Sequence, residues 1–259
     1  MPSRRFPIGE TATSWSNHSG IWIGTSGWTY DGWRGPFYPE GLAKKDWLRY
    51  YATKFSTTEI NGSFYRTPAL DTVRAWRNQT PDGFLFSWKA SKFITHWKRL
   101  TAKCGNSIEL METRLNALGP KLGAVLFQLP PHFSKNRARL ESFLEMLPQR
   151  HRYAFEFRHK SWYEDDIFGI LRRHDVALCL SDHGDAPAPW ETTARHVYVR
   201  GHGPGGRYRG SYPAKTLRRW ADAIAAWKRE KREVLVYFDN DQKAAAPKDA
   251  QRLIAMIDQ

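Results

Sequence analysis

The stretch YAFEFRHKSW, residues 153–162, decides the fold. With the two-residue period of a β-strand, its aromatic residues at positions 153, 155 and 157 share one face, while Ala154, Glu156 and Arg158 share the other. The stretch therefore predicts a buried strand with two charges on one face. Because a desolvated charge without a partner is strongly unfavourable, the pattern predicts either an internal Glu156–Arg158 ion pair or a binding site.

Seven more strand-type stretches flank this one, and helical patterns separate most of them. Strands are expected at residues 21–24, 57–61, 84–89, 122–131, 176–182, 196–203 and 233–241. Helices are expected at residues 42–55, 69–78, 107–118, 137–147, 165–173, 214–231 and 249–257, with no clear helix between the sixth and seventh strands. This alternation predicts an α/β protein, a single (β/α)8 TIM-type barrel over residues 21–259, preceded by a flexible N-terminal arm at residues 1–20.

Composition narrows the class of partner. The chain has 259 residues, with 40 Lys and Arg against 26 Asp and Glu, for a formal net charge of +14. This excess favours an anionic ligand, nucleic acid included, although a solvated basic surface explains it equally well. The two cysteines have no ligand spacing, and no apolar run has the length of a signal peptide or a membrane span. We therefore expect a soluble, cytoplasmic protein without a membrane partner.

Polar residues recur late in the expected strands, always on the inward side. In a (β/α)8 barrel, residues of one parity point inward and the active site lies at the C-terminal ends of the strands. The polar residues share the inward side and the late position in five strands, which chance placement of polar residues would not produce. The pattern therefore favours a functional site at the end of the barrel where the strands terminate, the barrel mouth. The residues of this pattern are Glu59, Asn61, Ser87, Lys89, Gln128, Glu156, Arg158, Arg200 and His202.

Several motifs at these strand ends resemble one family. They are IGTSGWTYDGWRGPFYP (residues 23–39), EINGSFYRTP (59–68), the pair Thr95–His96, FQLPPHF (127–133), FEFRHKSW (155–162), VRGHG (199–203) and YFDNDQKAAAPKDA (237–250). Together they resemble the YecE-like family, a domain of unknown function (DUF 72), from about residue 21 to the C-terminus. The resemblance supports the barrel and implies no reaction. One departure is Asp239, where the family pattern has the first residue of an Asn pair.

An anion site uses most of the expected mouth. Lys89, Arg158 and Arg200 are three cations at one end of the barrel, followed by the glycine-rich loop 201–210. Because such barrels commonly bind phosphate on the loops after strands seven and eight, we expect an enzyme acting on a phosphorylated or polynucleotide ligand, for example a phosphoester hydrolase. The competing interpretation is a non-catalytic nucleic-acid-binding protein. A glycoside hydrolase using Glu59 and Glu156 is a weaker alternative, because two glutamates can act as acid and base.

The candidate residues follow from this interpretation. Glu59, Glu156 and His202 are the expected acid–base groups. No resident metal or cofactor is expected, because the cations at the mouth repel a metal ion and HExxH-type motifs are absent. The expected ligand-binding residues are Trp28, Tyr30, Asn61, Tyr65, Lys89, His96, Gln128, Arg158, His159, Trp162, Arg200 and Asn240.

Overall fold

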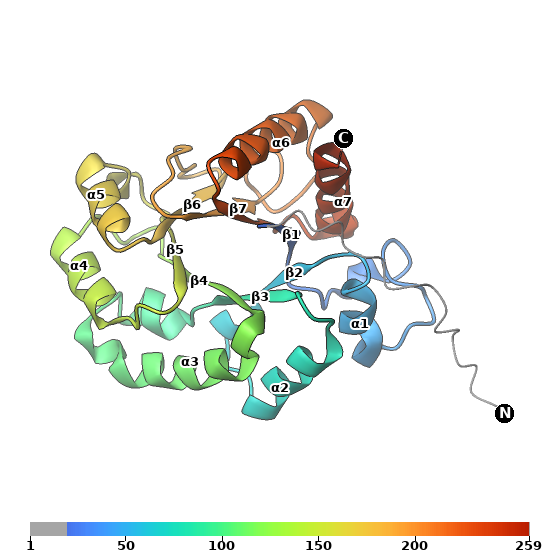
Figure 1. Cartoon of the computed structure of the whole chain (residues 1–259), viewed down its shortest axis with the longest axis horizontal. Helices are drawn as coiled ribbons and strands as arrows, with labels where there is room; N and C mark the ends of the chain where they lie inside the picture. Colours follow the sequence, from blue (N-terminus) through green and yellow to red (C-terminus); the bar gives the residue numbers. More distant parts are fainter. Residues whose placement is uncertain (1–19, 259) are drawn as a thin grey trace.

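The computed structural model describes residues 20–258, so the expected arm at residues 1–20 lies, except for Gly20, outside the described residues. Eight parallel strands close into a barrel in chain order, with β1 paired to both β2 and β8 (Figure 1). This confirms the (β/α)8 barrel. The strands are β1 Ile21–Ser26, β2 Thr57–Ile60, β3 Leu85–Lys89, β4 Leu122–Gln128, β5 Arg152–Glu156, β6 Ala177–Ser181, β7 His196–Gly201 and β8 Glu233–Phe238.

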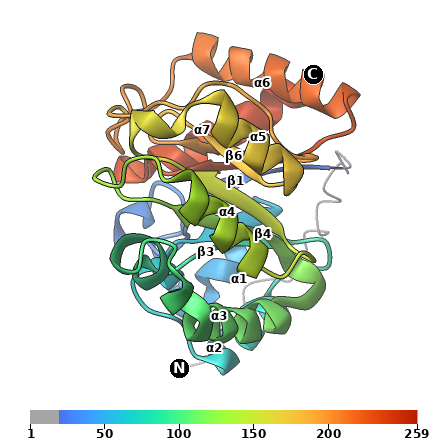
Figure 2. The same ribbon diagram turned by 90° about the vertical axis from the view of Figure 1, so that its left-hand side faces the viewer.

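Helices surround the strands on all sides in the view of Figure 1, and Figure 2 shows α5, α6 and α7 on the side of the barrel opposite α2 and α3. As expected, residues 182–195 connect β6 to β7 without a helix. No helix among residues 20–258 is long and apolar enough to cross a membrane. The α-helices of the described residues are α1 Trp47–Tyr51, α2 Leu70–Gln79, α3 Gly105–Leu118, α4 Arg137–Met146, α5 Asp165–Arg173, α6 Ala214–Arg229 and α7 Ala245–Ile257.

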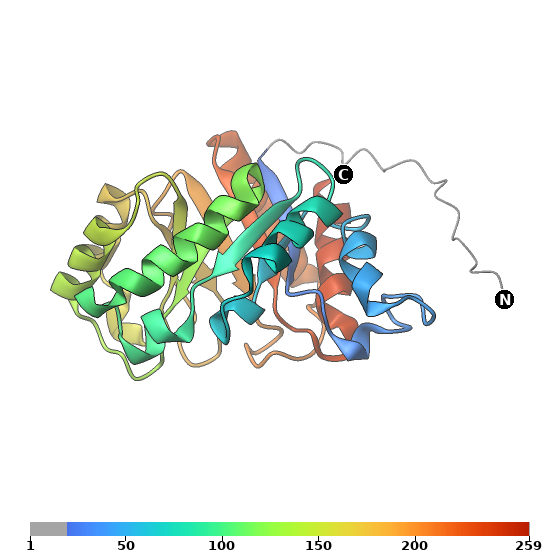
Figure 3. The ribbon, with the colours of Figure 1, turned by 90° about the horizontal axis from the view of Figure 1, so that it is seen from below.

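The parity of the strand residues separates two cores. Phe127 and Phe155 face outward and stack at 5.1 Å between ring centroids, within the large core beneath the helices. Ala154 and Leu126 belong to a separate, smaller cluster inside the barrel. Figure 3 shows the strands running obliquely between the helices. The side assignment read from residues 153–162 is therefore confirmed.

Two helix boundaries differ from the sequence-based expectation. The helix expected at residues 42–55 is only Trp47–Tyr51. A 3₁₀ turn at Lys44–Asp46 precedes it, and the chain tightens into i→i+3 bonds at Thr53 and Lys54 after it. The helix expected from residue 249 begins at Ala245, with Pro247 in its first turn, where a missing N–H has no cost. Asp249 looked like a helix start, but its buried carboxylate accepts from the Tyr212 amide instead.

Candidate functional site

Arg200 lies at the centre of the polar residues at the strand C-termini. It belongs to β7, and its side chain is 0% exposed. Its Nη1 donates to Glu156 Oε2 at 2.7 Å, and its Nη2 donates to Glu59 Oε1 at 2.9 Å and to Asp239 Oδ2 at 2.8 Å. Burial by itself lowers the pKa of Arg200, but the three carboxylates raise it well above its ordinary value. Arg200 is therefore a permanent cation whose charge is satisfied within the protein.

Glu59 is held from below by hydroxyl groups. Tyr198 donates to Glu59 Oε2 at 2.7 Å, and Ser26 donates to Oε1. One layer deeper, the Tyr237 hydroxyl lies 2.8 Å from those of both Thr57 and Ser87. Since Glu59 is fully buried and both its oxygens are occupied, the geometry makes it a support for Arg200 rather than a group facing a ligand.

Glu156 is likewise fully buried, and four side chains donate to it, the longest contact being that of Ser181 Oγ with Oε1 at 3.4 Å. Arg158 Nε donates to Oε1 at 2.6 Å, while Gln128 Nε2 at 3.1 Å and Arg200 Nη1 donate to Oε2. Burial raises the pKa of this carboxyl, but Arg158, Arg200, His202 and Lys89 outweigh burial and hold the pKa well below its ordinary value. The Glu156–Arg158 ion pair predicted from the sequence is thus present, and Glu156 is ionised at neutral pH.

His202 lies between the two arginines. Its Nε2 is 3.2 Å from Arg158 Nη2 and 3.1 Å from Arg200 Nη1. Because a guanidinium only donates, this nitrogen must be the acceptor, and the ring proton is assigned to Nδ1, which faces Asp182 Oδ1 at 3.4 Å. The structure places His202 in the cluster, with its lone pair already engaged by arginine.

The glycine-rich loop after β7 packs against protein rather than surrounding an open cradle. A side chain at Gly206 would begin 2.2 Å from the Gly184 amide nitrogen, and one at Gly203 would begin 2.4 Å from the Arg209 carbonyl oxygen. Close backbone approach therefore explains these two glycines. Beyond them, Tyr208 covers Arg158, which donates to its hydroxyl at 2.7 Å.

Lys89, at the end of β3, differs from the two arginines. Its residue is 6% exposed, and its Nζ makes one hydrogen bond, to Asn61 Oδ1 at 3.1 Å, and lies 4.7 Å from the centroid of the Phe64 ring. Within residues 20–258, no carboxylate lies within the 4.0 Å of an ion pair with this ammonium. Burial first, and then the charge of Arg200, lower its pKa to about 8.

His96 lies beside Lys89 on the loop after β3. Its Nδ1 is 2.9 Å from the Thr95 hydroxyl, and its ring meets the edge of Phe64 at 5.0 Å between centroids. Burial, followed by the charges of Lys89 and Arg158, lowers its pKa to about 4, so the ring is neutral at physiological pH. His96 and Lys89 are accordingly neighbours with different protonation states.

Three of the expected ligand-binding aromatic residues have other positions. Trp28 is buried against Trp76, with ring centroids 5.2 Å apart, and Trp162 is buried in a stack on Phe157 at 4.8 Å. Both belong to the core under the helices, which contradicts their expected role in stacking on a ligand. Tyr30 lies nearer the mouth, but its hydroxyl donates to the Ser26 carbonyl at 2.5 Å. The position of an aromatic residue near an expected loop therefore did not distinguish core residues from ligand-binding residues.

Two expected polar ligand-binding residues serve the fold instead. The Asn240 amide donates to the Gly210 carbonyl at 2.7 Å and to Asp249 Oδ2 at 2.9 Å, so it ties the loop after β7 to α7. His159 accepts from the Ser161 amide at 3.2 Å and caps a short 3₁₀ turn. These hydrogen bonds require no ligand, although Asn240 Oδ1 is buried without a hydrogen-bond partner within residues 20–258.

The structure also adds residues that the sequence reading did not select. Asp239 is the third carboxylate on Arg200, and Ser26 and Tyr198 complete the contacts of Glu59. Tyr198 and Asp239 have the inward parity of their strands, so that signal was available. The contact of Tyr208 with Arg158 had none, because the two residues are 50 positions apart and joined by loop geometry.

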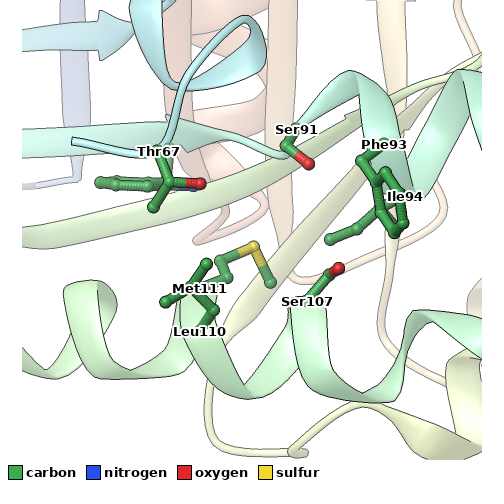
Figure 4. Close-up of a pocket in the computed structure, with 8 residues that line it drawn as sticks. Thr67, Ser91, Phe93, Ile94, Ser107, Leu110 and Met111 are labelled. Carbon is green, nitrogen blue, oxygen red and sulfur yellow. The ribbon is translucent and has the colours of Figure 1, made fainter.

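The two described hollows lie away from this cluster. A cavity of about 220 Å³ lies between α3 and the helical turn Phe93–Trp97 that follows β3 (Figure 4). Its lining is mainly Trp88, Phe93, Ile94, Leu110 and Met111. A larger groove of about 650 Å³ lies at the opposite end of the barrel, where Arg150, Arg152, Arg173 and Arg195 each pair with a carboxylate. Among residues 20–258, no three His, Cys, Asp or Glu side chains form a group suited to a metal ion.

Comparison with known proteins identifies relatives over nearly the whole chain. A family model described as "Protein of unknown function DUF72" matches residues 22–259. The UPF0759 protein YecE of Escherichia coli (strain K12) is 31% identical over 144 residues, which are 55% of this chain and 50% of that protein; this match spans half the length of the relative. The UPF0759 protein YunF of Bacillus subtilis is 24% identical over 92% of this chain and 95% of its own length.

Solved structures share the architecture. A DUF72 family protein from Thermotoga maritima has a TM-score of 0.83 and 26% identity, with 92% of this chain and 99% of that chain covered. A DUF72 family protein from Enterococcus faecalis has a TM-score of 0.77 and 20% identity, with 94% and 99% covered. The names of these relatives state no activity, so a function has to be argued from the residues of the mouth.

Proposed function

This chain belongs to the DUF72 family, as the sequence motifs indicated, and we propose that its barrel mouth is an enzyme site for a phosphorylated ligand whose anionic group lies beside Lys89. One observation carries the proposal: Lys89 is buried, and within residues 20–258 it has no carboxylate partner. An unpaired buried ammonium is unfavourable, and a bound phosphate supplies the missing charge. Arg158 is a second source of positive charge at the mouth, and His96 experiences the charges of both Lys89 and Arg158. Within residues 20–258, three of the five N–H groups of Arg158 have partners and two remain.

The carboxylates take supporting roles in this proposal. Glu59 and Glu156 both bond to Arg200, and the depressed pKa of Glu156 keeps it ionised, so it has no proton to donate at neutral pH. The same engagement argues against a glycoside hydrolase, since the Arg200 guanidinium bonds to both carboxylates and bridges them. In this proposal His96 transfers protons to or from the ligand, because its neutral ring is half-buried beside Lys89.

Inorganic phosphate is the simplest probe of this site. Phosphate is expected to raise the melting temperature of the wild-type protein, because a ligand at 100 times its Kd stabilises the folded state by about 2.7 kcal/mol. Lys89→Met is expected to abolish that increase. Arg195→Ala, at a side chain 91% exposed at the other end of the barrel, is the control and should keep it. An absent increase in the wild type, or an equal increase in Lys89→Met, would contradict the proposal.

A specific surface feature favours a second candidate, the non-catalytic binding of single-stranded nucleic acid. Tyr65 and Trp97 are 69% and 65% exposed, and the Lys92 ammonium lies 5.9 Å from the ring centroid of Tyr65 and 5.3 Å from that of Trp97. Exposed aromatic rings beside a cation are the usual platform for stacked bases. The formal charge of +14 fits the same partner.

Binding of a labelled oligothymidine at increasing salt tests this second candidate. We expect an affinity that falls steeply with salt, and a loss of affinity in Trp97→Ala. Trp190→Ala is a matched control, because Trp190 is 50% exposed and stacks on Trp227 near α6. If both variants bind equally well, Tyr65 and Trp97 do not form the platform for the bases. If only Arg173→Ala in the groove at the opposite end weakens binding, the polyanion binds there instead.

A further inference from the structure

We propose that Lys89 is a nucleophile that forms an imine with a small aldehyde or ketone carrying an anionic group. This inference rests on the proposed anion site and narrows its ligand to a carbonyl compound. The reacting group would be the ε-amine, and the anion would lie toward the free N–H groups of Arg158. A protonated imine keeps the positive charge of the lysine, so the attraction for the anionic group survives the reaction.

The number of hydrogen-bond partners distinguishes Lys89 from the other buried lysine. Lys121 is 8% exposed, and its Nζ donates to the Arg77 carbonyl at 2.7 Å, the Thr80 carbonyl at 2.6 Å and the Thr80 hydroxyl at 3.3 Å. Those three acceptors match the three donors of an ammonium. In the described part of the chain Lys89 has one acceptor, Asn61 Oδ1, which leaves the rest of its amino group without a partner there.

The surroundings of Lys89 also hold the amine in place. Its backbone ends β3, where the Ser63 hydroxyl donates to the Lys89 carbonyl at 2.6 Å. Phe64 covers one side of the ammonium, and Asn61 receives its single hydrogen bond. An amine on a rigid strand, with one polar contact to orient it, suits attack on a bound carbonyl.

The charges around Lys89 come from three strands and from the segment after β8. Arg200 of β7 disfavours protonation, as burial does, whereas Glu59 of β2, Glu156 of β5 and Asp239 after β8 favour it. Neutral His96 faces it from the loop after β3. The resulting pKa of about 8 raises the neutral fraction at pH 7 to roughly a tenth, from well under a thousandth at an ordinary lysine pKa.

The reaction balances without an oxidant or a further reactant. The ammonium first gives one proton to His96, and the freed Nζ lone pair attacks the carbonyl carbon. The carbonyl oxygen takes up a second proton from the nitrogen, and the proton held by His96 then passes to the resulting hydroxyl. The carbon–oxygen bond then breaks as water leaves and the carbon–nitrogen double bond forms. The net change is one ammonium and one carbonyl giving one protonated imine and one water. His96 is the nearest neutral imidazole for carrying the proton between nitrogen and oxygen.

Reductive trapping tests the inference. The protein is incubated at pH 7 with glycolaldehyde phosphate and cyanoborohydride, and the modified lysines are identified by peptide mass spectrometry. We expect one dominant adduct on Lys89, at least tenfold above that on exposed Lys160 or on buried, fully bonded Lys121. Glycolaldehyde without the phosphate should label Lys89 at least tenfold less. Lys89→Arg should lose the dominant adduct while phosphate still raises its melting temperature.

The outcomes separate this inference from the function on which it rests. If phosphate stabilises the wild type but Lys89 carries no more adduct than the exposed lysines, imine formation is overturned and the anion site stands. If phosphate gives no stabilisation in the wild type, the anion site is overturned as well. Equal labelling with and without the phosphate group would overturn the claim that an anionic group guides the carbonyl. Lys89→Met should lose the adduct as Lys89→Arg does, which protects the test against one variant that misfolds.

Discussion

Arg200 and Lys89 are both buried cations at the same end of the barrel, yet their surroundings are opposite. Arg200 contacts three carboxylates and the hydroxyl of Ser26, whereas Lys89 contacts one amide oxygen and one aromatic face. Burial of a charge is tolerable when counter-charges surround it, and Arg200 meets this condition although its Nε has no hydrogen-bond partner within residues 20–258. The difference indicates that Arg200 organises the mouth and that Lys89 is the cation left for a ligand.

Replacing Arg200 should have the largest effect on stability. Arg200→Met leaves Glu59, Glu156 and Asp239 close together without their shared counter-charge, and removing one partner of a buried pair costs about 3–5 kcal/mol. We expect a loss of at least that size in the free energy of unfolding, measured by urea denaturation. Arg195→Ala removes an exposed ion pair with Asp175 and should cost less than about 1 kcal/mol. Similar losses in the two variants would show that the Arg200 network is not structural.

Arg158 is the intermediate case and should give an intermediate loss. Arg158→Ala removes one of four donors to Glu156, which keeps Arg200, Gln128 and the weaker contact of Ser181, so we expect a cost of about 2–4 kcal/mol. Since the depressed pKa of Glu156 contributes stability above pH 4.5 that is lost as the pH falls, the variant should lose less stability than the wild type on acidification. A loss that matches Arg200→Met, or one that phosphate fully reverses, would remove the distinction between the two arginines.

These contrasts also show how far the sequence alone could reach. Parity and depth correctly brought Glu59, Glu156, Arg200 and His202 to one end of the barrel, because both follow from the regular geometry of strands. They did not show which cation has carboxylate partners, because those partners come from strands far apart in the chain. Trp162 illustrates the same limit: its stack on Phe157 depends on how the 3₁₀ turn folds back, which no periodicity records.

Replacing either of the two buried lysines should change the free energy of unfolding least. The comparison is nevertheless the most decisive, because one replacement should stabilise the protein and the other should destabilise it. The folded-state pKa of Lys89, about 8, lies below its ordinary value of 10.5, so between these pH values the unfolded chain binds more protons than the folded one. Stability therefore rises with pH across this window, and the full penalty of the buried ammonium applies below pH 8. Lys89→Met removes that penalty, and we expect a gain of about 1–2 kcal/mol at pH 7, after loss of the Asn61 hydrogen bond and the Phe64 contact.

Lys121→Met is the matched control for that gain. It leaves the carbonyls of Arg77 and Thr80 without their donor, so it should cost about 1–3 kcal/mol at pH 7. The gain in Lys89→Met should also shrink as the pH rises toward and above 10.5, because Lys89 is then neutral in the folded chain and increasingly neutral in the unfolded chain. Denaturant melts of both variants at pH 7 and pH 10 measure this. If Lys89→Met is as destabilising as Lys121→Met at pH 7, then Lys89 is a satisfied structural cation, and the reason for expecting a ligand beside it disappears.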